Sequence, residues 1–307
     1  MASGLIVSDL LLSIRRRAAI PTTAVTGSAD ADLLAYANEE LKLFLAADIL
    51  RVREEYFAFN SDATLSGTAY RVPYRAIGGK LRMVATMDDS DNIVEVLPRI
   101  EPERLVDLTG TGNLIGFYVD GGYIRLVPTA TTSATQLRLA YHIRPNALAS
   151  SGTQAVTAIN TTTKVVTVAS TTGYSTSLAC DFVAGKPGYH HLADGIDLTP
   201  TATTSTTLTF ATLPSTLAVG DYVCLAETTP YAQVPAEFHP VLAQRTAVRL
   251  LEAGGYAEQL GQAQKTLADM EAAVGILTTP RVDASPQKII NRYGALSGNG
   301  WRYRYGP

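Results

Sequence analysis

The chain has 307 residues, of which 46% are hydrophobic and 17% charged, and its formal net charge is −3 at pH 7. This much apolar side chain with so little net charge excludes a chain that is disordered throughout. The near-neutral charge is unlike that of a sequence-specific DNA-binding protein. Two cysteines cannot form a disulfide framework, which is typical of a protein that folds inside a cell.

The N-terminal part of the chain predicts two helices. Apolar side chains at three- and four-residue steps predict a first helix over residues 8–20, before Pro21, and a stronger one over residues 30–56. Asp48 lies on the apolar stripe of the second helix, and we interpret it as a carboxylate at a subunit contact or at the end of the core. The arginines at 15–17 follow the first apolar stretch, whereas a signal peptide has its basic residues first. No apolar run reaches the ~20 residues of a membrane helix, so we expect no membrane partner.

From residue 57 the apolar residues alternate with polar ones, which predicts β-strands. Over residues 57–145 the pattern recurs in short segments separated by turns, so we expect a small antiparallel sheet or sandwich. Asp120, Gly121 and Gly122 lie between two such segments, and the glycines tolerate the positive φ angles of a tight hairpin turn. We interpret the acidic run at 88–92 as a solvated turn, because it lacks the glycine and the distal Glu of a calcium loop.

A break in composition at Pro145–Thr153 precedes a Thr-rich stretch. Threonine is β-branched and favours strands, and here it alternates with apolar residues. We therefore expect a separate small β-barrel or sandwich in this stretch.

The helical period returns after Pro235, where two further helices are expected, with Gly254 and Gly255 between them. An amphipathic helix must bury its apolar stripe, so the early and late helices should pack together. The sequence therefore predicts an α+β protein with a helical bundle built from the N- and C-terminal helices, inserted antiparallel β regions and an extended C-terminal arm. The expected boundaries are 1–56 and 233–277 for the helical core, 57–145 for the first β region, 146–232 for the Thr-rich insertion and 278–307 for the arm.

The C-terminal arm combines cations with aromatic side chains. Its five Lys and Arg are opposed only by Asp283, and it holds the chain's only Trp. Such residues gain most from burial and are typical anchors of protein interfaces. We predict that the arm docks on another protein through Arg281, Lys288, Ile289, Ile290, Arg292, Tyr293, Trp301, Arg302, Tyr303, Arg304 and Tyr305. The alternatives are a segment that folds back on its own domain and a nucleic-acid-binding tail, for which the cations are sparse.

The sequence contains no established catalytic motif. It lacks the G-x-S-x-G elbow and the phosphate loop, and the glycines of Gly110–Gly116 precede a strand, which indicates a turn. A metal site formed by His190 and His191 with the two cysteines is an alternative, but the spacing matches no zinc pattern, and Cys180 and Cys224 are better interpreted as small buried side chains.

We therefore predict a protein that is not an enzyme and that has no cofactor or metal. Two other functions are weighed beside a structural one. A hydrolase would have a dispersed site at His142 or His239. A receptor- or carbohydrate-binding tail component is favoured by the Thr-rich stretch and its tyrosines.

Several segments carry a resemblance to a known family. They lie at both ends of the chain and in the first β region: DLLLSIRRRAAIP, ADLLAYANEELKLFLAADILRVREEYF, YRVPYRAIGGKLRMV, VPAEFHPVLAQRTAVRLLEAGG and SPQKIINRYGAL. They resemble the head-to-tail adaptor (connector) proteins of tailed bacteriophages. The resemblance covers most of the chain outside the Thr-rich stretch, which it does not explain.

The resemblance implies a structural virion protein at the head–tail interface, assembled in the host cytoplasm. Such adaptors form a homo-oligomeric ring, typically of twelve copies, that joins the portal protein to the tail or nozzle protein and lines the channel for genomic DNA. Their C-terminal arms reach onto the portal, and the arm corresponds here to Pro280–Pro307. A slightly acidic channel wall would let DNA pass without sequence-specific binding. We expect Arg15–Arg17 to lie away from the channel, in acidic subunit contacts or at the portal seam.

Overall fold

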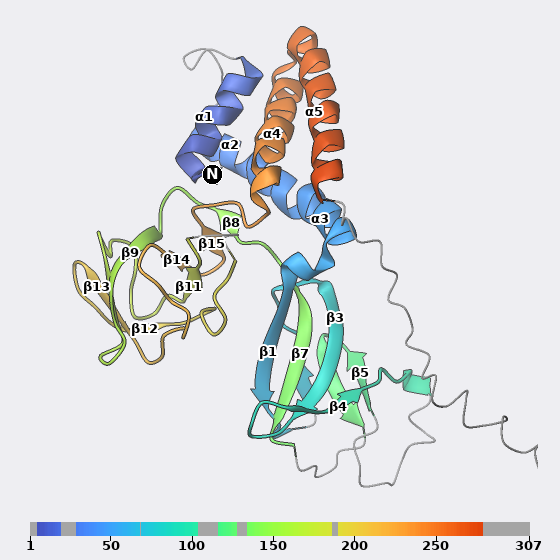
Figure 1. The fold of residues 1–307 in the computed structure, drawn as a ribbon, viewed down its shortest axis with the longest axis vertical. Helices are drawn as coiled ribbons and strands as arrows, with labels where there is room; N and C mark the ends of the chain where they lie inside the picture. The colour runs from blue at the N-terminus through green and yellow to red at the C-terminus, as the bar shows by residue number, and fades with distance from the viewer. Residues whose placement is uncertain are drawn as a thin grey trace, which may run out of the picture.

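The structure is a computed structural model, and it describes residues 5–19, 29–67, 69–103, 116–127, 134–185 and 190–278. Helices occupy both ends of this described part, and strands occupy its middle (Figure 1). The helices are α1 (Val7–Ala18), α2 (Asp30–Glu39), the π-helical η1 (Glu40–Leu45), α3 (Ala46–Val52), the 3₁₀ turns η2 (Glu54–Phe57) and η4 (Ala236–Phe238), α4 (His239–Gly254) and α5 (Ala257–Thr278). Within the described ranges, none of these helices is both long and apolar enough to cross a membrane.

The helices share one hydrophobic core around α4. Ten of the 16 residues of α4 are buried, and α1, α2 and α5 all contact it. Residues Leu10 and Ile14 of α1, Leu33 of α2 and Leu242 of α4 are almost fully buried in this core. Each such side chain stabilises the fold by roughly 1.5–3 kcal/mol relative to exposure. The apolar stripes that the sequence indicates are therefore buried against one another.

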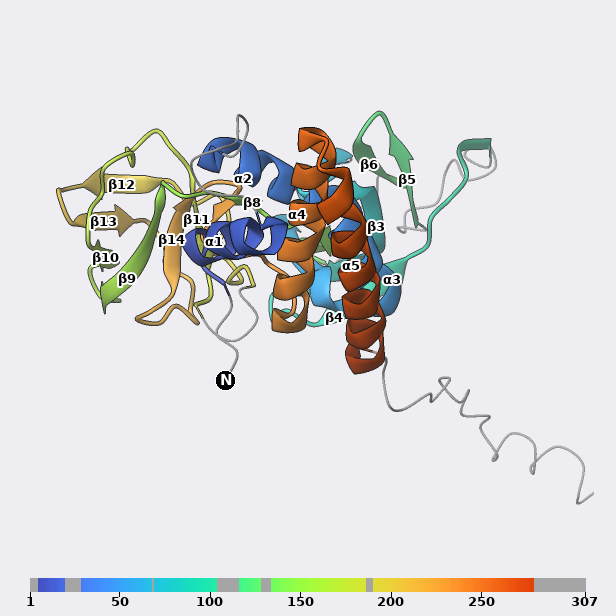
Figure 2. The same ribbon diagram turned by 90° about the horizontal axis from the view of Figure 1, so that it is seen from above.

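The predicted fold class, an α+β protein built on a helical bundle, is wrong. The described residues form a mixed α/β structure with many antiparallel strands. α4 and α5 run side by side, but α2 to α3 passes across them in Figure 1 and α1 crosses α4 in Figure 2, so the helices do not align as a bundle. The physical reason is that α4 is buried around most of its circumference. Its neighbours then cover it from several directions instead of along one shared seam.

The strands of residues 58–143 form two antiparallel sheets, which we call the first β unit. One has the strand order β1-β7-β3-β4 and the other β2-β6-β5. Their apolar faces meet in a small core that includes Val84, Ile124 and Leu137. The expected hairpin is confirmed: β5 and β6 are joined at Gly121 and Gly122, whose φ angles are 54° and 83°. The strands are β1 (Ala58–Thr64), β2 (Ala69–Arg71), β3 (Ala76–Met87), β4 (Ile93–Leu97), β5 (Gly116–Asp120), β6 (Tyr123–Val127) and β7 (Gln136–Ile143).

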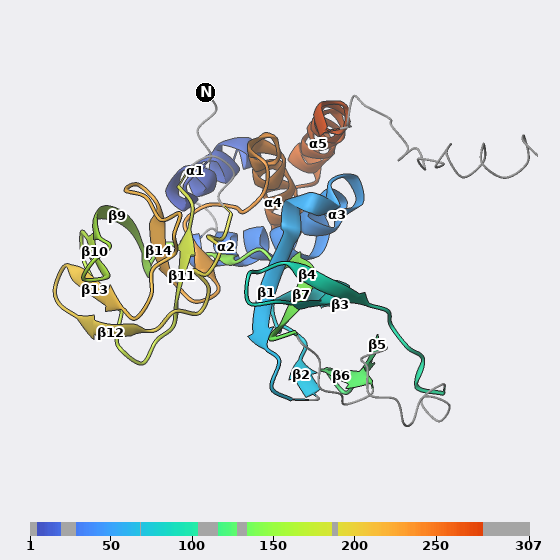
Figure 3. The same cartoon turned by 60° about the horizontal axis from the view of Figure 1, so that its bottom comes forward.

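The Thr-rich stretch forms a six-stranded sheet, which we call the insert. Its strand order is β11-β14-β9-β10-β13-β12, and the sheet curls into a half-barrel around Phe182, Leu208 and Val223. In β13 the threonines alternate with buried Leu208 and Phe210, as the period-two pattern predicts. Figure 3 shows the insert and the first β unit as two separate groups of strands. The remaining strands are β8 (Ala147–Leu148), β9 (Thr153–Asn160), β10 (Val165–Val168), β11 (Cys180–Val183), β12 (Pro200–Thr203), β13 (Thr207–Phe210), β14 (Tyr222–Leu225) and β15 (Thr228–Thr229).

The short parallel pair of β8 with β15 brings the two ends of the insert together beside the helices. Asn38 of α2 fixes this position, because its side chain accepts a hydrogen bond from the Leu148 N–H (2.6 Å) and donates one to the Leu148 carbonyl (3.1 Å). The predicted domain boundaries stay predictions, and the predicted arm lies outside the described residues except for Thr278, which ends α5.

Candidate functional site

The most strongly polar buried feature is a cluster where the first β unit meets the insert, and we call it the junction cluster. Arg75 lies in the turn before β3 and is 4% exposed. Its guanidinium group donates to both carboxylate oxygens of Asp181 (2.6 and 3.0 Å) and to Asp197 (2.5 Å). It also donates to the Tyr74 hydroxyl (2.9 Å) and, at 3.4 Å, to the side-chain oxygen of Asn146. One arginine therefore joins the first β unit to the insert.

Asp181 is the other half of this junction cluster and is fully buried. Because β11 alternates its faces, Cys180 and Phe182 point into the core of the insert and Asp181 points to the opposite face. Besides the two bonds from Arg75, its carboxylate accepts the side-chain amide of Asn146 (2.8 Å) and the backbone N–H groups of Glu227 (2.9 Å) and Asp197 (3.0 Å). A buried ion pair is tolerable only when its polar atoms are satisfied in this way.

The protonation states follow from this geometry. Burial raises the pKa of Asp181, but the hydrogen bonds and the charge of Arg75 outweigh burial and hold that pKa below its ordinary value. Burial likewise lowers the pKa of Arg75, and the bonds and charge of Asp181 more than reverse this, so the Arg75 pKa lies above its ordinary value. Both groups are therefore charged near neutral pH, and Arg75 and Asp181 form an ion pair within the junction cluster.

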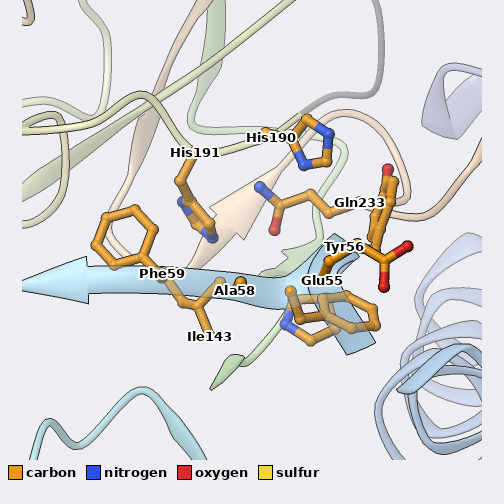
Figure 4. Close-up of a pocket in the computed structure, with 10 residues that line it drawn as sticks. Glu55, Tyr56, Ala58, Phe59, Ile143, His190, His191 and Gln233 are labelled. Carbon is orange, nitrogen blue, oxygen red and sulfur yellow. The ribbon is translucent and has the colours of Figure 1, made fainter. Parts of the chain in front are cut away.

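A cavity of about 270 Å³ lies beside the junction cluster, between the first β unit, the insert and the loop before α4 (Figure 4). Its lining includes Tyr56, Phe59, His190, His191 and Gln233. His191 is held at this place because it pairs with Val183 of β11, and the Gln233 side chain extends toward it in Figure 4. The oxygen of Gln233 accepts the Asn146 N–H (2.7 Å), which connects the cavity wall to the junction cluster.

The cavity contains buried polar atoms with unused hydrogen-bonding capacity. Both ring nitrogens of His191 and the side-chain nitrogen of Gln233 are buried, and in the described part of the chain no hydrogen bond of ordinary geometry reaches them, although the Arg144 backbone lies close enough to favour the protonated His191 ring. Burial lowers the pKa of His191 to about 4, although the nearby Asp181 carboxylate opposes this shift. A neutral imidazole offers one donor and one acceptor, so the cavity can bind ordered water or a small polar group.

The cysteines and the other histidines that the sequence singled out are not among the residues that line this cavity. Cys180 and Cys224 are buried, and burial raises the pKa of Cys180 to about 12, so its thiol stays protonated and weakly nucleophilic. His142 lies in β7 and His239 at the start of α4, so the two histidines of the hydrolase alternative belong to different units. Across the described ranges, no group of three His, Cys, Asp or Glu is placed to hold a metal ion.

The structure places several residues that the sequence singled out. Asp48 pairs with Arg245 (2.6 Å) at the edge of the helical core. Arg15 forms an ion pair with Asp30, whereas Arg17 donates to Gln244 (3.0 Å). The Asp88 side chain accepts hydrogen bonds from the backbone N–H groups of Ser90 and Asn92 within the acidic turn (2.8 and 2.9 Å).

The predicted docking residues all lie outside the described residues. They are Arg281, Lys288, Ile289, Ile290, Arg292, Tyr293, Trp301, Arg302, Tyr303, Arg304 and Tyr305. Conversely, the fold brings together three residues that were not predicted from the sequence, namely Arg75, Asp181 and Gln233. One signal was available, because Asp181 interrupts an otherwise apolar strand (Cys-Asp-Phe-Val) and a buried carboxylate needs a cation.

Comparison with known protein families finds no family model that matches this chain, and a search of curated proteins finds no match either.

Proposed function

We propose that this protein is a structural head-to-tail adaptor of a tailed bacteriophage. In this proposal it forms a ring, of twelve copies as in the family that it resembles, between the portal protein and the tail or nozzle protein. Genomic DNA passes through the ring without sequence-specific binding. The family is suggested by the segments that resemble adaptor proteins. The exposed surface of the helices supports the proposal independently.

The observation that carries the proposal is the exposed apolar surface of the helices. Leu43 is 62% exposed and Phe44 44% exposed in η1, and Ile276 and Leu277 are 79% and 68% exposed at the end of α5. Only three of the 22 residues of α5 are buried, so most of this long helix faces away from its own core. Apolar side chains exposed on neighbouring helices are typical of a surface that other protein chains cover.

The test is docking to portal rings purified from the same phage. A chain that ends at Thr279 keeps every described helix and strand, so we expect an unchanged circular dichroism spectrum and a cooperative melting transition. It should nevertheless lose sedimentation with portal rings, because it lacks the aromatic and cationic anchors. As a matched control, the full chain with Lys164→Ala alters a cation of the insert and should sediment normally. Normal docking of the truncated chain would contradict the proposal.

A second candidate, carbohydrate or receptor binding, is favoured by a larger groove between the first β unit and the insert. This groove has a volume of about 910 Å³, and its lining includes Phe59, Tyr74, Asp194 and Asp197. Aromatic faces beside carboxylates suit a sugar, because the rings stack on its apolar side and the carboxylates accept its hydroxyl groups. Specific glycan-array binding that Tyr74→Ala abolishes, together with no affinity for portal rings, would favour this candidate over the adaptor.

A further inference from the structure

A groove of about 450 Å³ separates η1 and α3 from α4 and α5, and we call it the helix groove. Four of its lining residues have large apolar side chains, and we call them its floor. Leu43 and Phe44 come from η1, Val248 from α4 and Leu267 from α5. Covering the exposed parts of these side chains would contribute about 25 cal/mol per Å² of apolar area. The floor therefore favours an occupant with large apolar or aromatic side chains.

The charged residues that line the helix groove, which we call its rim, are mostly acidic. Glu40, Asp48, Glu252 and Glu271 contribute four carboxylates, against the two guanidinium groups of Arg245 and Arg249. Both arginines already form ion pairs: Arg249 with Glu40 (2.6 Å) and Arg245 with Asp48 (2.6 Å) and Glu271 (2.5 Å). Carboxylates thus remain in excess on the rim, and Glu252 lies among them as an exposed charge. An occupant with a net positive charge is favoured.

The C-terminal segment, residues 279–307, has the matching chemistry. It holds five Lys and Arg against one Asp, and its apolar and aromatic members include Ile289, Ile290, Tyr293 and Trp301. Its charge complements the rim and its side chains suit the floor. Because both its charge and its apolar side chains match the helix groove, we take this segment as the occupant.

The point of attachment also favours this segment. Thr278 ends α5, and its carbonyl accepts a hydrogen bond from the Arg53 side chain (3.3 Å) at the C-terminal end of α3. Glu271 and Leu267 lie about 10–17 Å back along α5, at 1.5 Å per residue. Roughly five extended residues cover that span. Trp301 lies 23 residues beyond Thr278, so the chain between them is long enough for Trp301 to reach the groove as well. A flexible tether of this length gives an effective concentration on the order of millimolar, which a separate copy at micromolar concentration cannot match.

We propose that the helix groove binds the chain's own C-terminal segment in the free protein. The segment then covers the apolar floor until a partner of higher affinity takes it. This second step rests on the proposed function, in which that partner is the portal, whereas the groove contact itself does not depend on it.

Trp301 makes the proposal measurable, because it is the chain's only tryptophan. In the full-length protein at low salt, we expect acrylamide to quench Trp301 several-fold less than in a synthetic peptide of residues 279–307, because the groove shields the indole ring from the quencher. Glu252→Lys and Leu43→Ser should each raise quenching toward the value of the peptide. Glu258→Lys on α5 and Val94→Ser on β4 are matched controls, since both residues are exposed and neither lines the groove. The controls should leave quenching unchanged.

Three outcomes would overturn the proposal. Quenching equal to that of the peptide would show that the segment does not bind the groove. Protection that survives both groove variants would place Trp301 elsewhere. Protection that appears only as the protein concentration rises would assign the groove to the segment of a second copy. None of these outcomes bears on portal docking, which is measured separately with portal rings, so the two proposals can fail independently.

Discussion

Two arginines, each held between two carboxylates, stabilise the protein at different depths. The side chain of Arg75 is 5% exposed and that of its partner Asp181 is fully buried. The side chain of Arg245 is 15% exposed, but its partners Asp48 and Glu271 are 40% and 39% exposed. The chemistry of the groups is the same and the surroundings differ. Water can solvate the carboxylates left by a broken Arg245 contact, but it cannot reach Asp181, so the two clusters should respond differently to the same substitution.

The largest effect is expected for Arg75→Ala. The substitution leaves the Asp181 carboxylate buried without its counter-ion, which should lower the free energy of unfolding by about 3–5 kcal/mol. Urea denaturation followed by circular dichroism measures the change. Arg75→Lys keeps a charge but loses the two-oxygen contact, so it should fall between the wild type and Arg75→Ala. A loss below about 1 kcal/mol for Arg75→Ala would show that burial does not distinguish the two clusters.

The second largest effect concerns the pH dependence of the free energy of unfolding. His191, beside the junction cluster, has its pKa lowered to about 4, whereas in the unfolded chain it is near 6.5. Between these values the unfolded chain binds more protons than the folded one, so stability falls as pH is lowered from 6.5 through 4. The contribution is up to about 3 kcal/mol. Unfolding measured at pH 7 and pH 5 should give a shallower pH dependence for His191→Gln than for the wild type. An identical dependence would contradict the lowered pKa.

Asp181 adds to the acid sensitivity in the same direction but at lower pH. Its pKa is depressed in the folded state, so the stability that it contributes is present above its ordinary pKa and is lost as pH falls through the lower, folded value. His191→Gln should therefore flatten the upper part of the acid transition and leave the lower part in place.

A smaller effect is expected for Arg245→Ala. Its partners are partly solvated, so the free energy of unfolding should fall by only about 1–2 kcal/mol. The substitution also leaves the carboxylates of the helix-groove rim without one of their two cations. A double-mutant cycle with Asp48→Ala separates the pair from the packing of the arginine stem. A coupling as large as the whole effect of Arg75→Ala would contradict the proposed dependence on burial.

The smallest effect is expected for Arg138→Ala. Arg138 contacts both oxygens of Asp62 (each 2.8 Å), with side-chain exposures of 22% for Arg138 and 33% for Asp62. The Arg138 side chain is more exposed than that of Arg245 (15%), and its ion pair is with one carboxylate where Arg245 pairs with two. A single ion pair of this exposure contributes about 0–1 kcal/mol. Denaturation at low and high salt should show a small difference that disappears as salt increases. A loss comparable to that of Arg245→Ala would mean that the two-oxygen geometry matters more than exposure.

The sequence predicted local structure better than it predicted the assembly of that structure. The apolar steps over residues 30–56 correspond to α2, η1 and α3, and the glycines after Asp120 correspond to the β5–β6 hairpin. The prediction of a helical bundle was wrong because the helical period indicates which face of a helix is buried, but not the angle at which a neighbouring helix crosses it. The predicted docking residues lie outside the described part of the chain, so their role stays a prediction.

The junction cluster could not be predicted from the sequence, because its residues are far apart in the chain. Asp181 is 106 residues from Arg75, and Gln233 is 87 residues from Asn146. Side-chain spacing along a strand could show that Asp181 faces away from the insert core, but it could not show that a guanidinium group from another unit would meet it there.

By itself, the sequence determined where the chain forms helices, strands and turns, because periodicity, β-branching and the φ freedom of glycine act between residues that are close in the chain. It also determined the unequal distribution of charge, with cations and aromatic residues gathered after residue 278. Which carboxylates are buried, and which cations neutralise them, depends on how the chain folds. Solvation and Coulomb energy depend on distance in space, and the fold sets that distance between residues that the sequence keeps far apart.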